Sequence, residues 1–116
     1  MTSALLRLSG VTAEPRHSVV ARLAAVLNDL GWVVDFSQFS NSALTLRFEL
    51  AARNAPRLRS ALAELPVALS RGSAEELAAL EQASAGELPD PLPGSVHLTF
   101  VHSEPDLRIP VPAVPG

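Results

Sequence analysis

Cysteine, lysine and tyrosine are absent from this 116-residue chain. Without cysteine there is no disulfide, thiol nucleophile or thiolate zinc site, and without lysine there is no Schiff-base chemistry. Aromatic residues make up only 4% of the chain, and no apolar run approaches the ~18 residues that a membrane-spanning helix needs. We therefore expect a cytoplasmic protein that has no membrane partner.

Apolar residues make up 47% of the chain, and the net charge is -3. A chain of this length and composition can bury roughly two-thirds of its unfolded surface, which is enough for one domain with its own core. Nonspecific nucleic-acid binding depends on positive charges that neutralise phosphates. An acidic chain without lysine is a poor candidate for that role, so we expect no nucleic-acid partner.

The first third of the sequence predicts a strand followed by a helix. Residues 4–9 alternate as a short strand, and Pro15 suits the first turn of a helix because its missing N–H costs nothing there. The apolar positions of this helix are Val19, Val20, Leu23, Val26, Leu27 and Leu30. Their spacing gives a single apolar stripe, and Gly31 is expected to end the helix in a left-handed conformation.

The next segments predict a β-hairpin formed by residues 32–39 and 43–50, joined by a three-residue turn at 40–42. With this loop the bulky side chains of both strands share one face, whereas a register shifted by one residue would mix polar and apolar sets. Trp32 then falls on the bulky face. On the other face Asp35 lies opposite Arg47, which predicts a cross-strand ion pair.

Helical spacing and capping signals predict a second helix over 54–65 and a small extra helix over 73–84. The last strand of the sheet has two candidates. Chain order favours residues 67–70, and length and strict alternation favour residues 95–102. Both segments can belong to the sheet.

This order of elements predicts an α+β fold, the ferredoxin-like β-α-β-β-α-β sandwich, with an antiparallel sheet and helices on one face. The extra helix, a C-terminal strand and a tail are added to it. We expect one domain over 1–103 and a proline-rich tail over 104–116 that docks against a neighbouring surface. The central strands would be 4–9 and 43–50.

The run from Val19 to Asp35, a helix of this pattern followed by Gly31 and a strand, resembles the ACT-type regulatory domains. The resemblance covers roughly residues 4–70. It implies a small-molecule sensor, often for amino acids, that works as a homodimer.

The open face of the predicted sheet is the first candidate site. Arg7 and Arg47 would lie on adjacent central strands, where two guanidinium groups can bind one carboxylate or phosphate. His97 and Asp35 share that face and complete the predicted ligand-binding set. The alternative is a solvated or dimer-facing sheet in which Asp35 and Glu49 neutralise both arginines.

A second candidate lies in the tail. In an extended chain His102, Glu104 and Asp106 point the same way, and these residue types bind zinc, manganese or iron. The alternative is an ordinary strand end that turns over a polar corner.

The sequence as a whole predicts a non-enzymatic domain that works as a homodimer, binds a small anionic metabolite or amino acid and carries no cofactor. A protein-assembly module without a ligand is the alternative, followed by a small metal-dependent enzyme that uses His102, Glu104 and Asp106.

Overall fold

A computed structural model describes residues 5–40 and 42–101, except for the side chain of Phe39. The elements in chain order are β1 (Leu6–Thr12), α1 (Arg16–Leu30), β2 (Gly31–Ser40), β3 (Ala43–Leu50), the 3-10 helix η1 (Ala52–Arg57), α2 (Leu58–Leu62), β4 (Ala68–Leu69), α3 (Arg71–Gln82), the 3-10 helix η2 (Ala85–Glu87) and β5 (Leu92–Phe100). Within these residues, no helix combines the length and the apolar character that crossing a bilayer requires.

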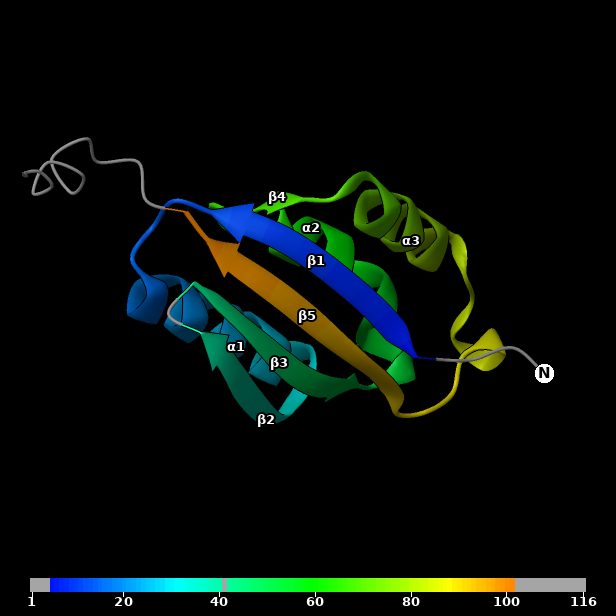
Figure 1. Ribbon diagram of the computed structural model, residues 1–116. Helices are drawn as coiled ribbons and strands as arrows, with labels where there is room; N and C mark the ends of the chain where they lie inside the picture. Colours follow the sequence, from blue (N-terminus) through cyan, green and yellow to red (C-terminus); the bar gives the residue numbers. More distant parts are fainter. Residues whose placement is uncertain (1–4, 41, 102–116) are drawn as a thin grey trace, which may run out of the picture.

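The strands form one five-stranded sheet in the order β2-β3-β5-β1-β4, with α1 and α2 behind it and α3 beside its β1 edge (Figure 1). The expected α+β class is confirmed, but the expectation of an antiparallel sheet is wrong because β1 and β5 are parallel. The remaining neighbours pair antiparallel. The two strands expected at the centre, β1 and β3, are therefore not neighbours, since β5 lies between them.

Both candidates for the last strand belong to the sheet. The short strand β4 pairs with the end of β1, at one edge. The long strand β5 takes the central position. Every second residue from Leu92 to Phe100 is apolar or glycine and is buried, and the residues between them are half-buried. A strand that buries one whole face suits the middle of a sheet.

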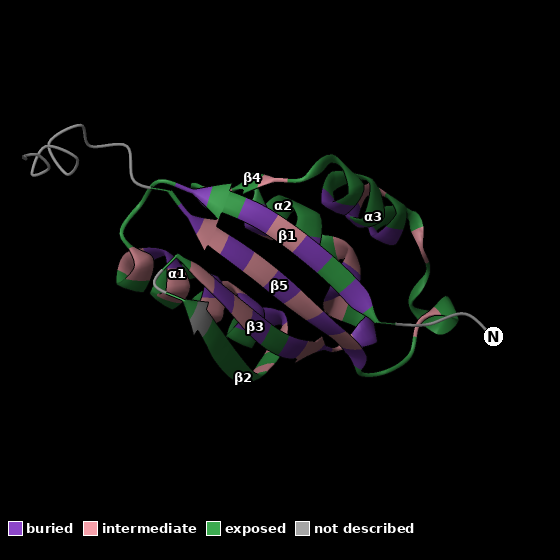
Figure 2. Cartoon of the chain, viewed as in Figure 1, coloured by how far each residue is buried: buried purple, intermediate pink, exposed green. Residues whose placement is uncertain are grey.

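The apolar stripe of α1 packs against the sheet as its spacing predicts. Val19, Leu23, Leu27 and Leu30 are buried, and Figure 2 shows the buried positions alternating along β1, β3 and β5. These strand side chains meet the helices in one continuous core. The opposite side chains of the same strands therefore form a second face that no described helix covers.

The β2–β3 hairpin has the predicted register in its middle but not at its ends. Asp35 faces Arg47 and Ser37 faces Thr45, as expected. Irregularities at Val34 and at residue 39 each shift the pairing by one position. Trp32 consequently pairs with Glu49 instead of Leu50, so its expected place on the core face is wrong.

Gly31 starts β2 directly after α1, and its role differs from the expected one. Its φ of -172° is extended backbone rather than left-handed. A Cβ at this position would lie 2.0 Å from the carbonyl oxygen of Glu49. The glycine is needed because β3 approaches the chain closely where α1 gives way to β2.

Candidate functional site

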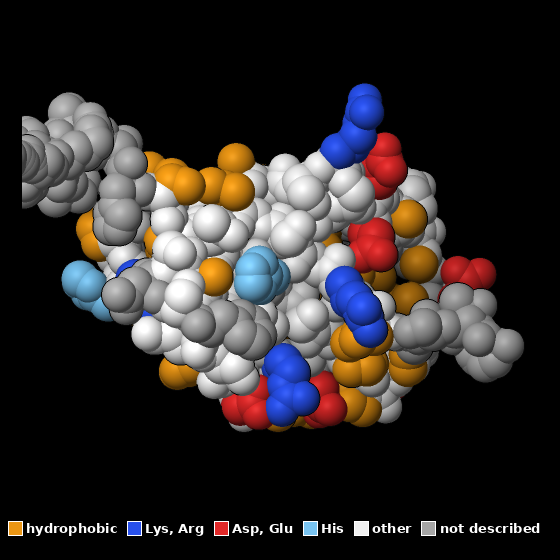
Figure 3. Space-filling view, in the orientation of Figure 1, with side chains coloured by type: hydrophobic (Ala, Val, Ile, Leu, Met, Phe, Trp, Pro, Cys, Tyr) orange, Lys and Arg blue, Asp and Glu red, His pale blue; other side chains and the backbone are white. Residues whose placement is uncertain are grey.

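The candidate site is the side of the sheet that faces away from the helices, which we call the open face. Register and burial place on or beside its strands the side chains of Leu5, Arg7, Ser9, Val11, Trp32, Val34, Asp35, Ser37, Ala43, Thr45, Arg47, Glu49, Pro93, Ser95, His97, Thr99 and Val101. Figure 3 looks onto this face, where a histidine stands near the centre and charged side chains lie to its right and below it. All four predicted ligand-binding residues lie on this face.

One row of residues crosses the open face from β1 to β2. The register pairs Arg7 with Ser95, Ser95 with Arg47, and Arg47 with Asp35. The two arginines therefore lie on strands separated by β5, about 10 Å apart at the backbone for two strand spacings. The prediction that they occupy adjacent strands is wrong, since parity identifies the face of a residue but not its neighbouring strand.

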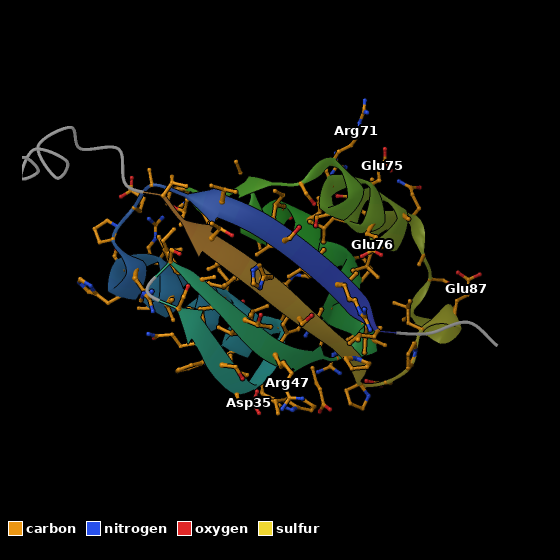
Figure 4. All side chains as sticks on the ribbon, viewed as in Figure 1. Asp35, Arg47, Arg71, Glu75, Glu76 and Glu87 are labelled. Carbon is orange, nitrogen blue, oxygen red and sulfur yellow. The ribbon has the colours of Figure 1, made fainter. Side chains whose placement is uncertain are left out.

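The predicted ion pair between Asp35 and Arg47 is confirmed. Arg47 Nε donates to Asp35 Oδ1 at 2.8 Å, and Arg47 Nη2 donates to Oδ2. The hydrogen bond from Arg47 lowers the pKa of Asp35 below its ordinary 3.8; desolvation opposes this shift, and the positive charge of Arg47 adds a smaller lowering. The pair lies at the β2–β3 edge of the sheet (Figure 4), with 60% of the arginine side chain and 46% of the aspartate side chain exposed.

Arg7 and Glu49 do not form the pair that would neutralise them. Glu49 Oε1 instead accepts a hydrogen bond from Trp32 Nε1 at 2.9 Å. Among residues 5–40 and 42–101, the ion pairs join Arg47 to Asp35 and Arg59 to Glu81, so Arg7 has no ion-pair partner there. The open face thus presents an exposed guanidinium on β1 and an engaged acid–base pair two strands away.

A hollow of about 440 Å³ lies along this row. It is lined by Leu5, Arg7, Val34, Thr45, Arg47, Phe48, Glu49, Pro93, Gly94 and Ser95. The hollow lies above Ser95, the residue at the middle of the row whose side chain is smaller than the arginines on either side of it. Its lining combines two guanidinium groups with an apolar border.

His97 lies one row away and is already engaged. Its Nδ1 lies 2.9 Å from Thr45 Oγ1 in a hydrogen bond, and the residue has a further interaction as well. Of the four predicted ligand-binding residues, Arg7 and Arg47 line the hollow, whereas Asp35 holds Arg47 from outside it and His97 contacts β3.

The predicted metal ligands His102, Glu104 and Asp106 lie outside the described residues, as does the expected tail over 104–116. Within the described part of the chain, no three histidine, aspartate or glutamate side chains gather as a metal site would require. The metal-dependent enzyme therefore stays a prediction from the sequence alone.

The sequence prediction missed the apolar border of the hollow. Val34 and Trp32 reach the open face because of the irregular pairing in β2, which the sequence does not reveal. Leu5 was detectable, since strand parity already places it beside Arg7. Trp32 and Val34 are 45% and 49% exposed, which is unusual for two large apolar side chains so close together on one strand. Phe36 is exposed as well, but it pairs with the buried Leu46 and therefore belongs to the helix side of the sheet.

Comparisons with protein-family models, curated proteins and solved structures find no match to this chain. The resemblance to ACT-type domains consequently stays a prediction, and the argument for function depends on the chemistry of the open face.

Proposed function

We propose that this chain is a non-enzymatic interaction and assembly module that binds a protein through the open face of its sheet. The observation that carries the proposal is the composition of β5. This central strand, Leu92–Phe100, contains no aspartate, glutamate, lysine or arginine. It places Pro93, Ser95, His97 and Thr99 at the middle of the open face.

Small uncharged side chains at the centre of a surface make it suitable for contact with another protein. Charged residues are depleted at the core of protein interfaces because their desolvation is costly, and polar groups gather at the rim. The open face has this arrangement. Its charged residues lie on the strands around β5, namely Arg7, Asp35, Arg47 and Glu49. Trp32 and Leu5 add apolar area beside them.

The resemblance to ACT-type domains supports a role in assembly. β1, α1, β2, β3, α2 and β4 follow one another in the order of a ferredoxin-like unit. In this view β5 is an additional strand inserted between β1 and β3. The resemblance implies that the chain works as a homodimer, and a ferredoxin-like unit formed by β1 to β4 is part of this proposal.

A small-anion sensor is the second candidate function, and the hollow favours it. Arg7 lacks an ion-pair partner among the described residues. Arg47 uses Nε and Nη2 for Asp35 and also lines the hollow, so its Nη1 is not engaged by Asp35. A carboxylate or phosphate above Ser95 would lie between the two guanidinium groups, with apolar contacts for the rest of a metabolite or amino acid.

The sensor predicts thermal stabilisation by a small anion. We would measure the melting temperature with leucine, glutamate and inorganic phosphate in turn, and expect stabilisation of about 2.7 kcal/mol at a concentration 100 times the dissociation constant. The double variant Arg7→Ala/Arg47→Ala should lose this effect. An unchanged melting temperature with every probe, or an undiminished shift in the double variant, counts against the sensor.

Maleimide labelling of an introduced cysteine tests the interaction module, because the chain has no cysteine of its own. Ser95→Cys places a thiol at the centre of the open face. In cells that naturally carry the chain, we expect N-ethylmaleimide to modify this thiol at least tenfold more slowly than in the dilute purified protein, because the bound partner covers it.

Ser60→Cys is the matched control. Ser60 is exposed on α2, in the layer on the opposite side of the sheet, and its thiol should react equally fast in cells and in dilute solution. If the thiol at position 95 reacts in cells as fast as in the dilute protein, the open face is free and the interaction module is ruled out.

A further inference from the structure

We propose that the occupant of the open face is a second copy of this chain, packed face to face with its strands aligned. This inference rests on the interaction module proposed above and names its partner. The two-fold axis runs parallel to the strands, midway between β3 and β5. The row of four residues from Arg7 to Asp35 then faces the same row of the second copy, which runs in the opposite order.

The charges of the row are complementary to its own reverse. Read from β1 to β2, the row is Arg7, Ser95, Arg47 and Asp35, which gives positive, neutral, positive and negative side chains. Reversal places Arg7 over Asp35 of the second copy, and Asp35 over its Arg7. Each carboxylate keeps its own Arg47 and gains a second guanidinium, so the exposed charge on β1 acquires a partner.

The neighbouring rows are compatible with the same axis. Glu49 pairs with Trp32 on one side and with Pro93 on the other, and Leu5 precedes β1 next to Pro93. Reversal brings Leu5 against Trp32 of the second copy, which covers two exposed apolar side chains. The row through His97 has serine or threonine at its other positions, so its reversal opposes no like charges.

The space between the two faces is compatible with the pairing. Arg47 and Asp35 are exposed, and the hollow above Ser95 has a volume of about 440 Å³. Reversal places the backbone of Arg47 in one copy opposite Ser95 of the other, and the Arg47 side chain stays bonded to its own Asp35 because two guanidinium groups already line the hollow. Aligned sheets pack about 10 Å apart, a separation that a long side chain spans when the residue opposite it is small.

The size of the face predicts a reversible dimer. Four strands spaced ~4.8 Å apart and about seven residues of ~3.4 Å each give a flat area of roughly 450 Å². Standard interfaces bury ~800 Å² on each partner. We therefore expect monomer and dimer to exchange, with the dimer favoured as the protein concentration rises and weakened by salt.

Reciprocal charge reversal tests this arrangement by sedimentation velocity. We expect the unaltered chain to shift from monomer to dimer between about 1 µM and 1 mM. Arg7→Glu alone and Asp35→Arg alone should each weaken the dimer at least tenfold, since like charges then meet at both ends of the row. An equimolar mixture of the two variants should dimerise again, because the charges at positions 7 and 35 of the mixed pair face their opposites at both ends of the row.

Arg71→Glu is the matched control for the change of charge. Arg71 projects from α3 away from the sheet (Figure 4), and this variant should dimerise like the unaltered chain. A chain that stays monomeric throughout, a dimer that Arg7→Glu weakens no more than Arg71→Glu does, or a variant mixture that stays monomeric overturns the proposal. Protection of the thiol at position 95 in cells would then still support an interaction module with a different partner.

Discussion

At the scale of single residues, the pairing of Asp35 with Arg47 shows what parity can predict. Both strands alternate, and the turn between them is short, so the charged residues on the polar face had few possible partners. The cross-strand neighbour of Arg7 could not be predicted in this way. Its neighbour across the sheet comes from residue 95, far along the chain, and alternation contains no information about which strand lies beside which.

Removing Arg47 should raise the pKa of Asp35 to its ordinary value. The hydrogen bond from Arg47 favours the ionised carboxyl and depresses the pKa. The stabilisation from this pair is therefore present above the unfolded pKa, near 3.8, and is lost as the pH falls through the lower folded value. A carboxyl-carbon NMR titration of Asp35 in the unaltered chain and in Arg47→Ala measures the difference.

Arg59→Ala is the control for this titration, because it removes the arginine of the other exposed ion pair, Arg59–Glu81. It should leave the Asp35 titration unchanged. An Asp35 midpoint that is the same with and without Arg47 would show that the pair does not persist in solution.

At the scale of elements, the sequence predicted most segments and misjudged their ends. The helical stripe from Val19 to Leu30 identified α1, and strict alternation identified β3 and β5. The irregular pairing at Val34 left no mark in the sequence, so Trp32 was placed on the wrong face. For the same reason the predicted site lacked its apolar border, because that border depends on which face of the sheet the side chains of β2 point to.

The packing of β5 against β3 depends on Gly94. A Cβ there would lie 2.6 Å from the ring of Phe48 and 3.1 Å from the carbonyl oxygen of Leu6. Because Phe48 is only 1% exposed, its ring has no free space to move into. We expect Gly94→Ala to lower the free energy of unfolding by about 1–3 kcal/mol, the usual cost of overpacking, as measured by urea denaturation.

Gly72→Ala serves as the comparison for this substitution. Gly72 lies in α3, and a Cβ there would meet no atom within 4 Å. Alanine at this position should stabilise the chain by about 0.4–1 kcal/mol, because it restricts the unfolded state. Equal effects of the two substitutions would mean that the close contact between Gly94 and Phe48 is absent.

At the scale of the whole molecule, β5 joins the two parts of the sheet. The segments from β1 to β4 follow a ferredoxin-like order, yet β5, the last strand among the described residues, lies between β1 and β3. The sequence predicted this order and left both last-strand candidates open. The sequence could not predict that β5 lies between β1 and β3. These two strands run antiparallel to each other on either side of β5, so they could equally well have paired directly.

A chain truncated after residue 70 should therefore fail to fold. It would lose six large buried side chains, namely Leu77, Leu80, Leu92, Val96, Leu98 and Phe100. Each contributes about 1.5–3 kcal/mol when fully buried, so their loss approaches or exceeds the ~5–15 kcal/mol that stabilises a whole domain. Truncation after residue 101 keeps all six and should unfold with a normal cooperative transition. Calorimetry and near-ultraviolet circular dichroism distinguish the two outcomes. Cooperative unfolding of residues 1–70 would instead mean that β1 and β3 pair directly once β5 is gone, and that the ferredoxin-like unit is autonomous.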